Sequence, residues 1–297
     1  MKILINRKPV HGPWGGGNNF VKAFVEVLPS FGHEIVHNFE NNIDIIFIQD
    51  PRYDELGISI NEAIQYKSKN NKCRIIQRIN ECDKRKNTKD VDSLLLQCSK
   101  YIDHTIFVSE WMKKYFYKKN WFCNSSSVLI NGVANYYSPG EKIKNNKINI
   151  VTHHWSDNYM KGFDIYDKLD NFVKTNKDYE FTYIGRERGT FKNSKVVPPL
   201  FGKDLALELT KHDVYVSASR FDPGPNHILE SLKCEIPTYS FSDGGGACEF
   251  TGESHVYDSF EALEQILLRK NFSKNKFLPA SWEQCIQELN ENTLIKC

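Results

Sequence analysis

The sequence has no long hydrophobic run, no clear excess of one charge and no closely spaced pair of cysteines. Its 297 residues include 39 Lys and Arg against 37 Asp and Glu, a net charge of +2. This near balance predicts no general attraction to nucleic acid or to acidic membranes. Apolar stretches such as "IDIIFI" are far shorter than the roughly 20 residues that span a bilayer, and the N-terminus lacks the apolar segment of a signal peptide. We therefore expect a soluble, cytoplasmic protein.

Patterns typical of metal sites are also missing. The eight cysteines are scattered without a Cys-x-x-Cys spacing, which argues against a zinc ribbon or a secreted disulfide scaffold. Neither HExxH nor EF-hand spacing occurs. Asp90 and Asp92 have a D-x-D spacing that holds metal in some enzymes, but "KDVDSLLLQC" is typical of the first turn of a helix, where aspartate is favoured anyway. We expect no metal and no cofactor.

What the sequence contains instead is an alternation of short β-branched runs with helical apolar spacing, which predicts an α/β fold with parallel sheets. Residues 131–147, "NGVANYYSPGEKIKNNK", have the composition of a linker, so we expect two doubly wound domains. The predicted strands include "KILIN", "EIVHN", "IDIIFIQ", "CRIIQRI", "HTIFVS", "SVLIN", "INIVTHH", "YEFTYIG", "DVYVSAS", "IPTYSF" and "HVYD"; the predicted helices cover 19–30, 58–69, 90–101, 110–119, 163–175, 203–211, a segment opening near Asn226, 259–270 and 281–295.

A glycine cluster lies between the first predicted strand and the first predicted helix, in "HGPWGGGNNF" at positions 11–20. Loops that follow the strands of such a sheet face its ligands. Glycines let a ligand approach the main chain, and the helix N-terminus offers N–H groups to an anion. The spacing matches neither G-x-G-x-x-G nor GK[ST], so the alternative of a merely tight turn stays open.

The second half contains two acidic residues at a loop-to-helix junction. Asp222 follows the strand "DVYVSAS", a Pro-Gly-Pro loop comes next, and Glu230 lies one turn into the helix that opens near Asn226. Carboxylates accept hydrogen bonds from hydroxyls, and the helix N-terminus favours phosphate. This combination suits a sugar nucleotide.

Several segments together resemble one family, the retaining glycosyltransferases of family 4, which include the glycogen-synthase-like enzymes. The acid-x7-acid pattern with its "SLKCEIP" tail is similar to that family's E-x7-E motif. Further similar segments follow in the expected order over nearly the whole chain: "GGGNNF", "FGHEIV", "FVSEWMKKYF", "LINGV", "KGFDIYDKL", "SDGGGACEF" and "SWEQCIQEL".

The resemblance implies a GT-B architecture, in which two Rossmann-like, doubly wound domains face each other across a cleft. An acceptor domain would cover residues 1–135 and a donor domain residues 148–280, joined by a linker at 136–147. The helix at about 281–297 would pack back on the first domain. The implied activity is transfer of a sugar from a nucleoside diphosphate sugar to a carbohydrate, lipid-linked or protein acceptor, with retention of configuration and without a metal.

The resemblance also implies roles for individual residues. Glu230 would bind the ribose hydroxyls, Asp222 the hydroxyls of the transferred sugar, and Lys161 the diphosphate. A lysine on such a loop suits that task independently, because its compact cation can stabilise a departing phosphate. The leaving phosphate itself would accept the proton of the acceptor. Backbone groups would complete the phosphate cradle at Gly16, Gly17, Gly224, Pro225 and Asn226.

Two positions of the predicted donor domain depart from the family pattern: the first acidic residue of the acid-x7-acid motif and a cation that would bind the phosphates. The first acid is the shorter Asp222 where the family has Glu. Ser156 stands where relatives carry an arginine, so a phosphate-binding cation is missing. His153 or His154, if protonated, or Arg186 could replace it; a histidine at a strand end is otherwise a hydrogen-bonded structural residue.

A third departure follows the fourth predicted strand, where many relatives carry a histidine and this chain has "RINECDKRKN". Asn80, Glu81 or Asp83 would then line the acceptor side of the cleft together with Asn18, and Arg78 could pair with one of them. The alternative is a polar loop with solvated charges.

Two further alternatives remain open at this stage. "WMKKYFYKKNWF", at 111–122, could touch a membrane surface or a lipid-linked acceptor, but we favour a helix whose Trp111 and Tyr115 pack inward. In place of an enzyme, the chain could be a non-catalytic subunit that binds a nucleotide sugar or a glycan. The missing arginine favours that alternative, and the retention of Asp222 and Glu230 argues against it.

Overall fold

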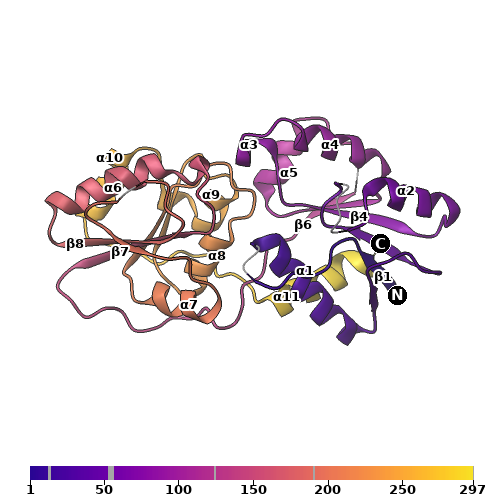
Figure 1. Ribbon diagram of the computed structural model, residues 1–297, viewed down its shortest axis with the longest axis horizontal. Helices are drawn as coiled ribbons and strands as arrows, with labels where there is room; N and C mark the ends of the chain where they lie inside the picture. The colour runs from indigo at the N-terminus through magenta and orange to yellow at the C-terminus, as the bar shows by residue number, and fades with distance from the viewer. Residues whose placement is uncertain (13–14, 53–56, 124, 190, 297) are drawn as a thin grey trace. The chain divides into compact units, whose positions relative to one another are not determined.

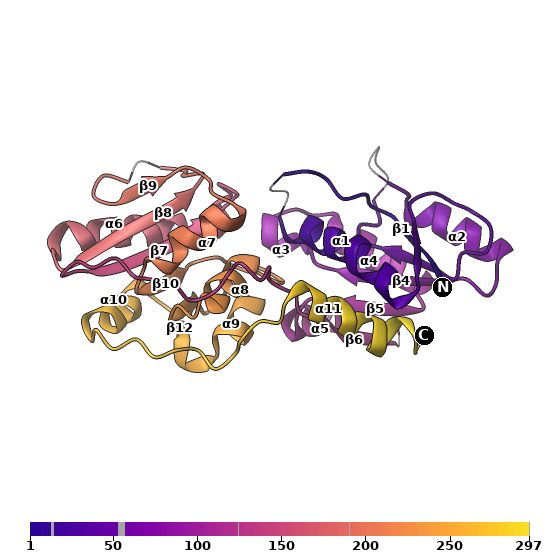
Figure 2. The same cartoon turned by 90° about the horizontal axis from the view of Figure 1, so that it is seen from below.

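The computed structural model describes residues 1–12, 15–52, 57–123, 125–189 and 191–296 (Figures 1 and 2). The chain divides into two compact units. Unit 1 comprises Met1–Gly132 and Ala280–Cys297, and unit 2 comprises Val133–Pro279. Among the helices of the described residues, none has the length and apolar character needed to span a membrane.

Unit 1 is built on a six-stranded parallel sheet with the strand order β2-β1-β3-β4-β5-β6. Its strands are rich in Ile and Phe because helices cover both faces of the sheet; all four residues of β3 are buried. The strands are β1 (Lys2–Ile5), β2 (Glu34–Val36), β3 (Ile45–Ile48), β4 (Arg74–Ile79), β5 (His104–Phe107) and β6 (Ser126–Val128).

Two helices from opposite ends of the chain share one face of this sheet. α1 (Gly16–Val27) and α11 (Trp282–Leu289) lie side by side and bury one apolar cluster with the sheet (Figures 1 and 2). The other face is covered by α2 (Ile60–Lys69), α4 (Val91–Cys98) and α5 (Glu110–Tyr117). The short α3 (Asp83–Lys86) precedes α4, and 3-10 turns follow α1 (Leu28–Phe31) and α4 (Ser99–Tyr101). A π-helical turn, Asn290–Leu294, extends α11.

Unit 2 has a second six-stranded parallel sheet, in the order β12-β11-β10-β7-β8-β9. α6 (Phe163–Thr175) and α10 (Phe260–Leu268) pack on one face, and α7 (Gly202–Thr210) lies on the other (Figure 1). The strands are β7 (Ile148–His154), β8 (Tyr179–Gly185), β9 (Lys195–Val197), β10 (Val214–Ser217), β11 (Thr238–Phe241) and β12 (Val256–Tyr257), and the remaining helices are α8 (Asn226–Lys233) and α9 (Gly246–Thr251), with 3-10 turns at Tyr159–Lys161 and Glu253–His255.

Each sheet contains one point at which the chain reverses the direction in which strands are added. In unit 1 this point lies between β1 and β3, and in unit 2 it lies between β7 and β10. Open α/β sheets bind ligands outside the carboxyl ends of the strands at such a point. The topology therefore directs attention to the loops after β1 and β3 and to those after β7 and β10.

The predicted fold class is confirmed: the chain has two parallel, doubly wound α/β sheets of Rossmann-like type. Three short elements were not predicted. β9 has three residues and no buried position, so it lacks the apolar pattern of a strand. α9 has six residues within the glycine-rich segment, and α3 has four charged residues, "DKRK". Elements of this length leave almost no periodicity to detect.

Candidate functional site

The loop that carries Lys161 is fixed against the end of β10. Asn158 caps the 3-10 turn by accepting a hydrogen bond from the Met160 N–H at 2.9 Å. Gly162 has φ 86°, and a Cβ there would lie 2.2 Å from the carbonyl oxygen of Ala218. Only glycine fits this close approach, so the Lys-Gly pair seats Lys161 beside the loop that follows β10.

The same loop holds Asp222 through its backbone. Phe221 has a left-handed φ of 51°, which is uncommon for a bulky residue. Next to it, the Asp222 N–H donates to the Gly244 carbonyl at 3.2 Å, and the Gly246 N–H donates to the Asp222 carbonyl at 2.9 Å. These two backbone hydrogen bonds to the segment around Gly244 and Gly246 hold the Asp222 backbone in place and so set the direction of its side chain.

Lys161 and Asp222 form an ion pair that is largely shielded from solvent. Lys161 Nζ lies 2.8 Å from Asp222 Oδ2, and their side chains are 16% and 4% exposed. The Arg220 guanidinium, two residues before Asp222, makes two 2.8 Å hydrogen bonds to Asp164 at the start of α6 and lowers the pKa of that carboxyl. The charges on both loops are therefore matched in pairs.

Glu230 is held by a histidine from the neighbouring strand. His153 Nε2 lies 2.8 Å from Glu230 Oε2, and His153 Nδ1 lies 3.1 Å from the Tyr215 hydroxyl. Burial raises the pKa of Tyr215 well above its ordinary value, so that hydroxyl keeps its proton and can donate. His153 Nε2 is thus placed to donate a hydrogen bond to the Glu230 carboxylate.

His154 and Arg186, two of the residues considered for the missing cation, and Ser156, which stands in its place, differ in their surroundings. His154 is 3% exposed, its Nε2 lies 2.7 Å from the Tyr166 hydroxyl, and burial lowers its pKa well below the ordinary value. It is neutral, which does not support a role as a phosphate-binding cation. Ser156 accepts a hydrogen bond from the Asn158 N–H at 3.1 Å. Arg186 is exposed at the end of β8, with its guanidinium 4.4 Å from the ring centre of Trp155.

The start of α8 lies between the two acidic residues in sequence. The helix begins at Asn226, Pro225 precedes it, and Gly224 completes the turn. No side chain caps this end, and its first turn contains no acidic residue. The positive end of the helix dipole therefore lies beside the Asp222 loop without a negative side chain of its own.

Two residues expected on the acceptor side have structural partners instead. Asn18 bonds the backbone of Val10 through both amide atoms, at 2.8 and 2.9 Å. Asp83 accepts hydrogen bonds from the Val91 and Asp92 N–H groups and so caps α4. These contacts do not support direct binding of an acceptor by either residue. Gly16 and Gly17 form the start of α1, and the Asn80 amide lies close to Gly17.

The other sequence patterns have structural explanations. Asp92 is 4% exposed and is bonded by Tyr115 and Lys119, as expected for the first turn of a helix. Trp111 and Tyr115 pack against the apolar core of unit 1, so the inward-facing interpretation of this helix is confirmed. Among the described residues, no group of three or more His, Cys, Asp or Glu side chains is placed to hold a metal ion.

Sequence reasoning missed the link from Tyr215 through His153 to Glu230. Strand alternation gives a partial signal. Consecutive residues of β7 point to opposite faces of the sheet, so its two terminal histidines, His153 and His154, cannot both have the same partners. The identity of the partner was not readable, since His153 and Glu230 are 77 residues apart.

Neither a protein-family model nor any curated protein sequence matches the chain. Solved structures do match. HepE (Alr3699) of Anabaena, crystallised with UDP and glucose, is 11% identical, with 98% of each chain covered and a TM-score of 0.70. The apo lipopolysaccharide outer core galactosyltransferase WaaB is 13% identical, with 99% of this chain and all of that chain covered and a TM-score of 0.69.

A third structure, sucrose-phosphate synthase of Thermosynechococcus elongatus, is 13% identical, with 97% of this chain and 94% of that chain covered and a TM-score of 0.65. At such identities the likeness shows the fold alone. The chain has the two-domain, Rossmann-like GT-B fold.

Proposed function

We propose that the protein is a glycosyltransferase that transfers a sugar from a nucleoside diphosphate sugar to a carbohydrate, lipid-linked or protein acceptor, with retention of configuration. One observation carries the proposal: the Lys161–Asp222 ion pair and the His153–Glu230 contact both lie on segments at the carboxyl ends of β7 and β10, where the topology of unit 2 favours a ligand. The GT-B neighbours support it, because HepE is described with UDP and glucose and WaaB as a galactosyltransferase.

In this proposal donor binding replaces internal contacts with ligand contacts. The ribose hydroxyls would donate to Glu230, whose carboxylate His153 holds in place. Hydroxyls of the transferred sugar would replace Lys161 as hydrogen-bond donors to Asp222, and Lys161 would turn towards the diphosphate. Arg186, stacked on Trp155 beside the Ser156 segment, is the residue we propose for the missing cation. The uncapped start of α8, at Gly224–Asn226, would add N–H groups near the phosphates.

The proposed reaction needs no protein nucleophile. The acceptor oxygen forms a bond to the anomeric carbon on the face from which the diphosphate leaves, the bond from that carbon to the diphosphate oxygen breaks, and the acceptor proton passes to the leaving phosphate. Lys161 would stabilise the negative charge that develops on the phosphate in the transition state. We propose that no metal takes part.

A non-catalytic binding subunit is the second candidate. It is favoured by Ser156, which offers no charge, and by the Lys161–Asp222 pair, in which the two side chains satisfy each other without a ligand. This second candidate would bind a nucleotide sugar or a glycan without transferring a sugar, so turnover separates the two candidates.

The first test is a thermal-shift panel of uridine, guanosine, adenosine and cytidine diphosphates and their common sugar conjugates. A ligand present at 100 times its dissociation constant adds about 2.7 kcal/mol of stability. We expect one base to stabilise the wild type and Glu261→Gln, a control on the exposed side of α10, but not Glu230→Gln. Equal stabilisation of all three proteins would remove Glu230 from the site.

A further inference from the structure

Three segments at the amino edge of the sheet of unit 1 are rich in basic residues and nearly free of acidic ones. Residues 67–74 run from the end of α2 into β4, residues 99–103 run from the end of α4 to β5, and residues 113–123 run from α5 towards β6. Because β4, β5 and β6 are adjacent and parallel, these segments lie next to one another at the same edge. They contain nine Lys and Arg residues and one acidic residue, Asp103.

This single acidic residue joins the first two segments. Asp103 Oδ2 accepts a hydrogen bond from the Ile75 N–H at 2.7 Å, and the Asp103 N–H donates to the Ile75 carbonyl at 2.9 Å. Lys67 Nζ lies 2.5 Å from the same carboxylate. The other exposed basic residues of this edge have no ion pair within the described part of the chain, except Lys119, which pairs with Asp92; they are Lys69, Lys72, Arg74, Lys100, Lys114 and Lys118.

The third segment is joined to the second through Phe122. The Phe122 N–H donates to Ser99 Oγ at 3.3 Å, and Lys100 Nζ lies 5.0 Å from the centre of the Phe122 ring. The Tyr117 hydroxyl lies 2.9 Å from Ser126 Oγ at the start of β6. The basic residues are therefore carried on a backbone that the sheet and these contacts hold in place.

Aromatic rings are exposed among these basic residues. Phe122 is 57% exposed, Tyr101 is 52% exposed and Tyr117 is 42% exposed. They are different rings from Trp111 and Tyr115, which pack on the core of unit 1. Exposed Phe and Tyr rings together with lysines are typical of proteins that lie on a membrane, because the rings enter the headgroup layer while the ammonium groups meet the lipid phosphates.

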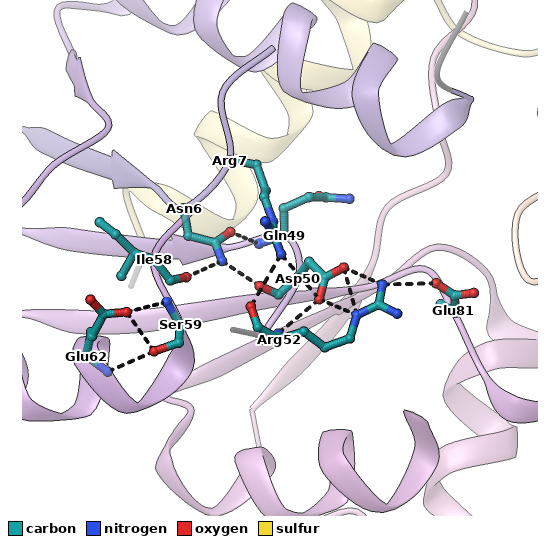
Figure 3. Close-up of polar contacts among 9 residues, drawn as sticks. All are labelled: Asn6, Arg7, Gln49, Asp50, Arg52, Ile58, Ser59, Glu62 and Glu81. Carbon is teal, nitrogen blue, oxygen red and sulfur yellow. Dashed lines mark hydrogen bonds and ion pairs between the residues drawn. The ribbon is translucent and has the colours of Figure 1, made fainter. Parts of the chain in front are cut away.

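The charged residues drawn in Figure 3, at the opposite edge of the same sheet, are paired. Arg52 pairs with Asp50 at 2.5 Å and lies 3.6 Å from Glu81. Arg7 lies 3.7 Å from Asp50, and Lys86 pairs with Glu81 at 2.6 Å. The unpaired basic residues thus gather at the amino edge, where the near-balanced total charge of the chain conceals them.

We propose that the amino edge of unit 1, formed by residues 67–74, 99–103 and 113–123, docks on the surface of a membrane that contains anionic lipids. The lysines bind the lipid phosphates, and the rings of Phe122, Tyr101 and Tyr117 enter the headgroup layer. The proposal does not rest on the proposed function, because this face lies at the edge opposite the loops that follow β1 and β3.

Two other occupants fit this face less well. Single-stranded nucleic acid stacks its bases on open aromatic faces, but the ammonium group of Lys100 lies over the ring of Phe122. A second copy of the chain that used the same face would bring like charges together. An anionic membrane complements both the charge and the exposed rings.

Cosedimentation of the full-length chain with lipid vesicles tests the proposal. One set of vesicles contains phosphatidylcholine alone, and the other contains equal parts of phosphatidylcholine and phosphatidylglycerol. We expect binding to the second set only, with an affinity that falls as salt is added. The triple variant Lys72→Gln, Lys100→Gln and Lys118→Gln has one change in each segment. It is expected to bind about a hundredfold more weakly, since each lysine near an anionic surface contributes about fivefold.

The matched control removes the same charge from unit 2. The triple variant Lys174→Gln, Lys177→Gln and Lys276→Gln changes exposed lysines there and is expected to bind the anionic vesicles as the wild type does. Phe122→Ser tests the rings separately, and we expect it to weaken binding about fivefold without changing the salt dependence. All the replaced side chains are exposed, so unchanged thermal unfolding verifies that each variant is folded.

Three results would overturn the proposal. The first is that the wild type does not bind the anionic vesicles. The second is that the two triple variants bind them equally. The third is that the wild type binds polyuridylate more tightly than the vesicles at the same phosphate concentration, which would assign the face to nucleic acid.

Discussion

The two points at which strand order reverses lie in closely similar parallel sheets, but the charged side chains near them are paired in opposite ways. In unit 2, Asp222 and Glu230 each have a partner already, in Lys161 and His153. In unit 1, Arg78 is buried without a carboxylate partner among the described residues, and the side-chain amides of Asn80 and Gln49 lie close to Gly17. The acidic side chains of unit 2 are therefore matched by internal partners, whereas the buried charge of Arg78 in unit 1 is not matched by a carboxylate in the described part of the chain.

The largest expected effect comes from breaking the charge balance of unit 2. Lys161→Met removes the cation beside the shielded Asp222 carboxylate, and loss of one partner of a buried pair costs about 3–5 kcal/mol. Urea unfolding measures the change. Lys270→Met is the control, because the Lys270–Asp178 pair has the same 2.8 Å distance but is exposed, and we expect little change there. Equal effects of the two variants would show that the Lys161–Asp222 pair is solvated.

The next effect tests the packing that places Lys161. Gly162→Ala combines a left-handed φ with a clash against Ala218, and we expect a loss of roughly 2–4 kcal/mol. Gly252→Ala has a similar φ of 82° but open space around its Cβ, so it measures the conformational strain alone. If both alanines cost the same in urea unfolding, the close approach to Ala218 does not constrain the loop.

A third prediction concerns acid. The pKa of His154 is lowered by burial from an ordinary value of 6.5, so the unfolded chain binds a proton before the folded one does. Stability is complete above about pH 6.5 and is lost as the pH falls towards the folded pKa, by up to about 1.4 kcal/mol per pH unit. His154→Phe is expected to flatten this slope between pH 6.5 and 5. An unchanged slope would mean that His154 is protonated in the folded protein.

The smallest expected effect comes from replacing His153, and it tests what this residue does for Glu230. If it orients Glu230 towards ribose, His153→Phe is expected to reduce the preference for a ribonucleoside diphosphate over its 2′-deoxy analogue about tenfold. Tyr215→Phe, which removes the hydroxyl beside His153 Nδ1, is expected to have a weaker effect in the same direction. A merely structural role would weaken both nucleotides equally, and calorimetric titration distinguishes the two outcomes.

The features of the fold that depend on local sequence patterns could be predicted from the sequence. The alternation of strands and helices, the linker composition and the helix opening at Asn226 are local, and they led to the two doubly wound sheets. Short elements such as β9 and α9 escaped because three to six residues carry no period. The site partners escaped for a different reason. The contacts from His153 to Glu230 and from Arg78 to Asn131 join residues 77 and 53 positions apart, and only the folded sheets bring them together.

The proposed function requires unit 2 to bind a nucleotide sugar and activate it for transfer. The most direct measurement follows the slow transfer of that sugar to water by proton NMR, using the donor that stabilises the protein best. We expect the sugar released first to have the anomeric configuration of the donor, and Glu230→Gln to release none. Release at the wild-type rate by Glu230→Gln would contradict the site. A donor that binds but is never cleaved, even with acceptor sugars present, would contradict the enzyme and favour the binding subunit.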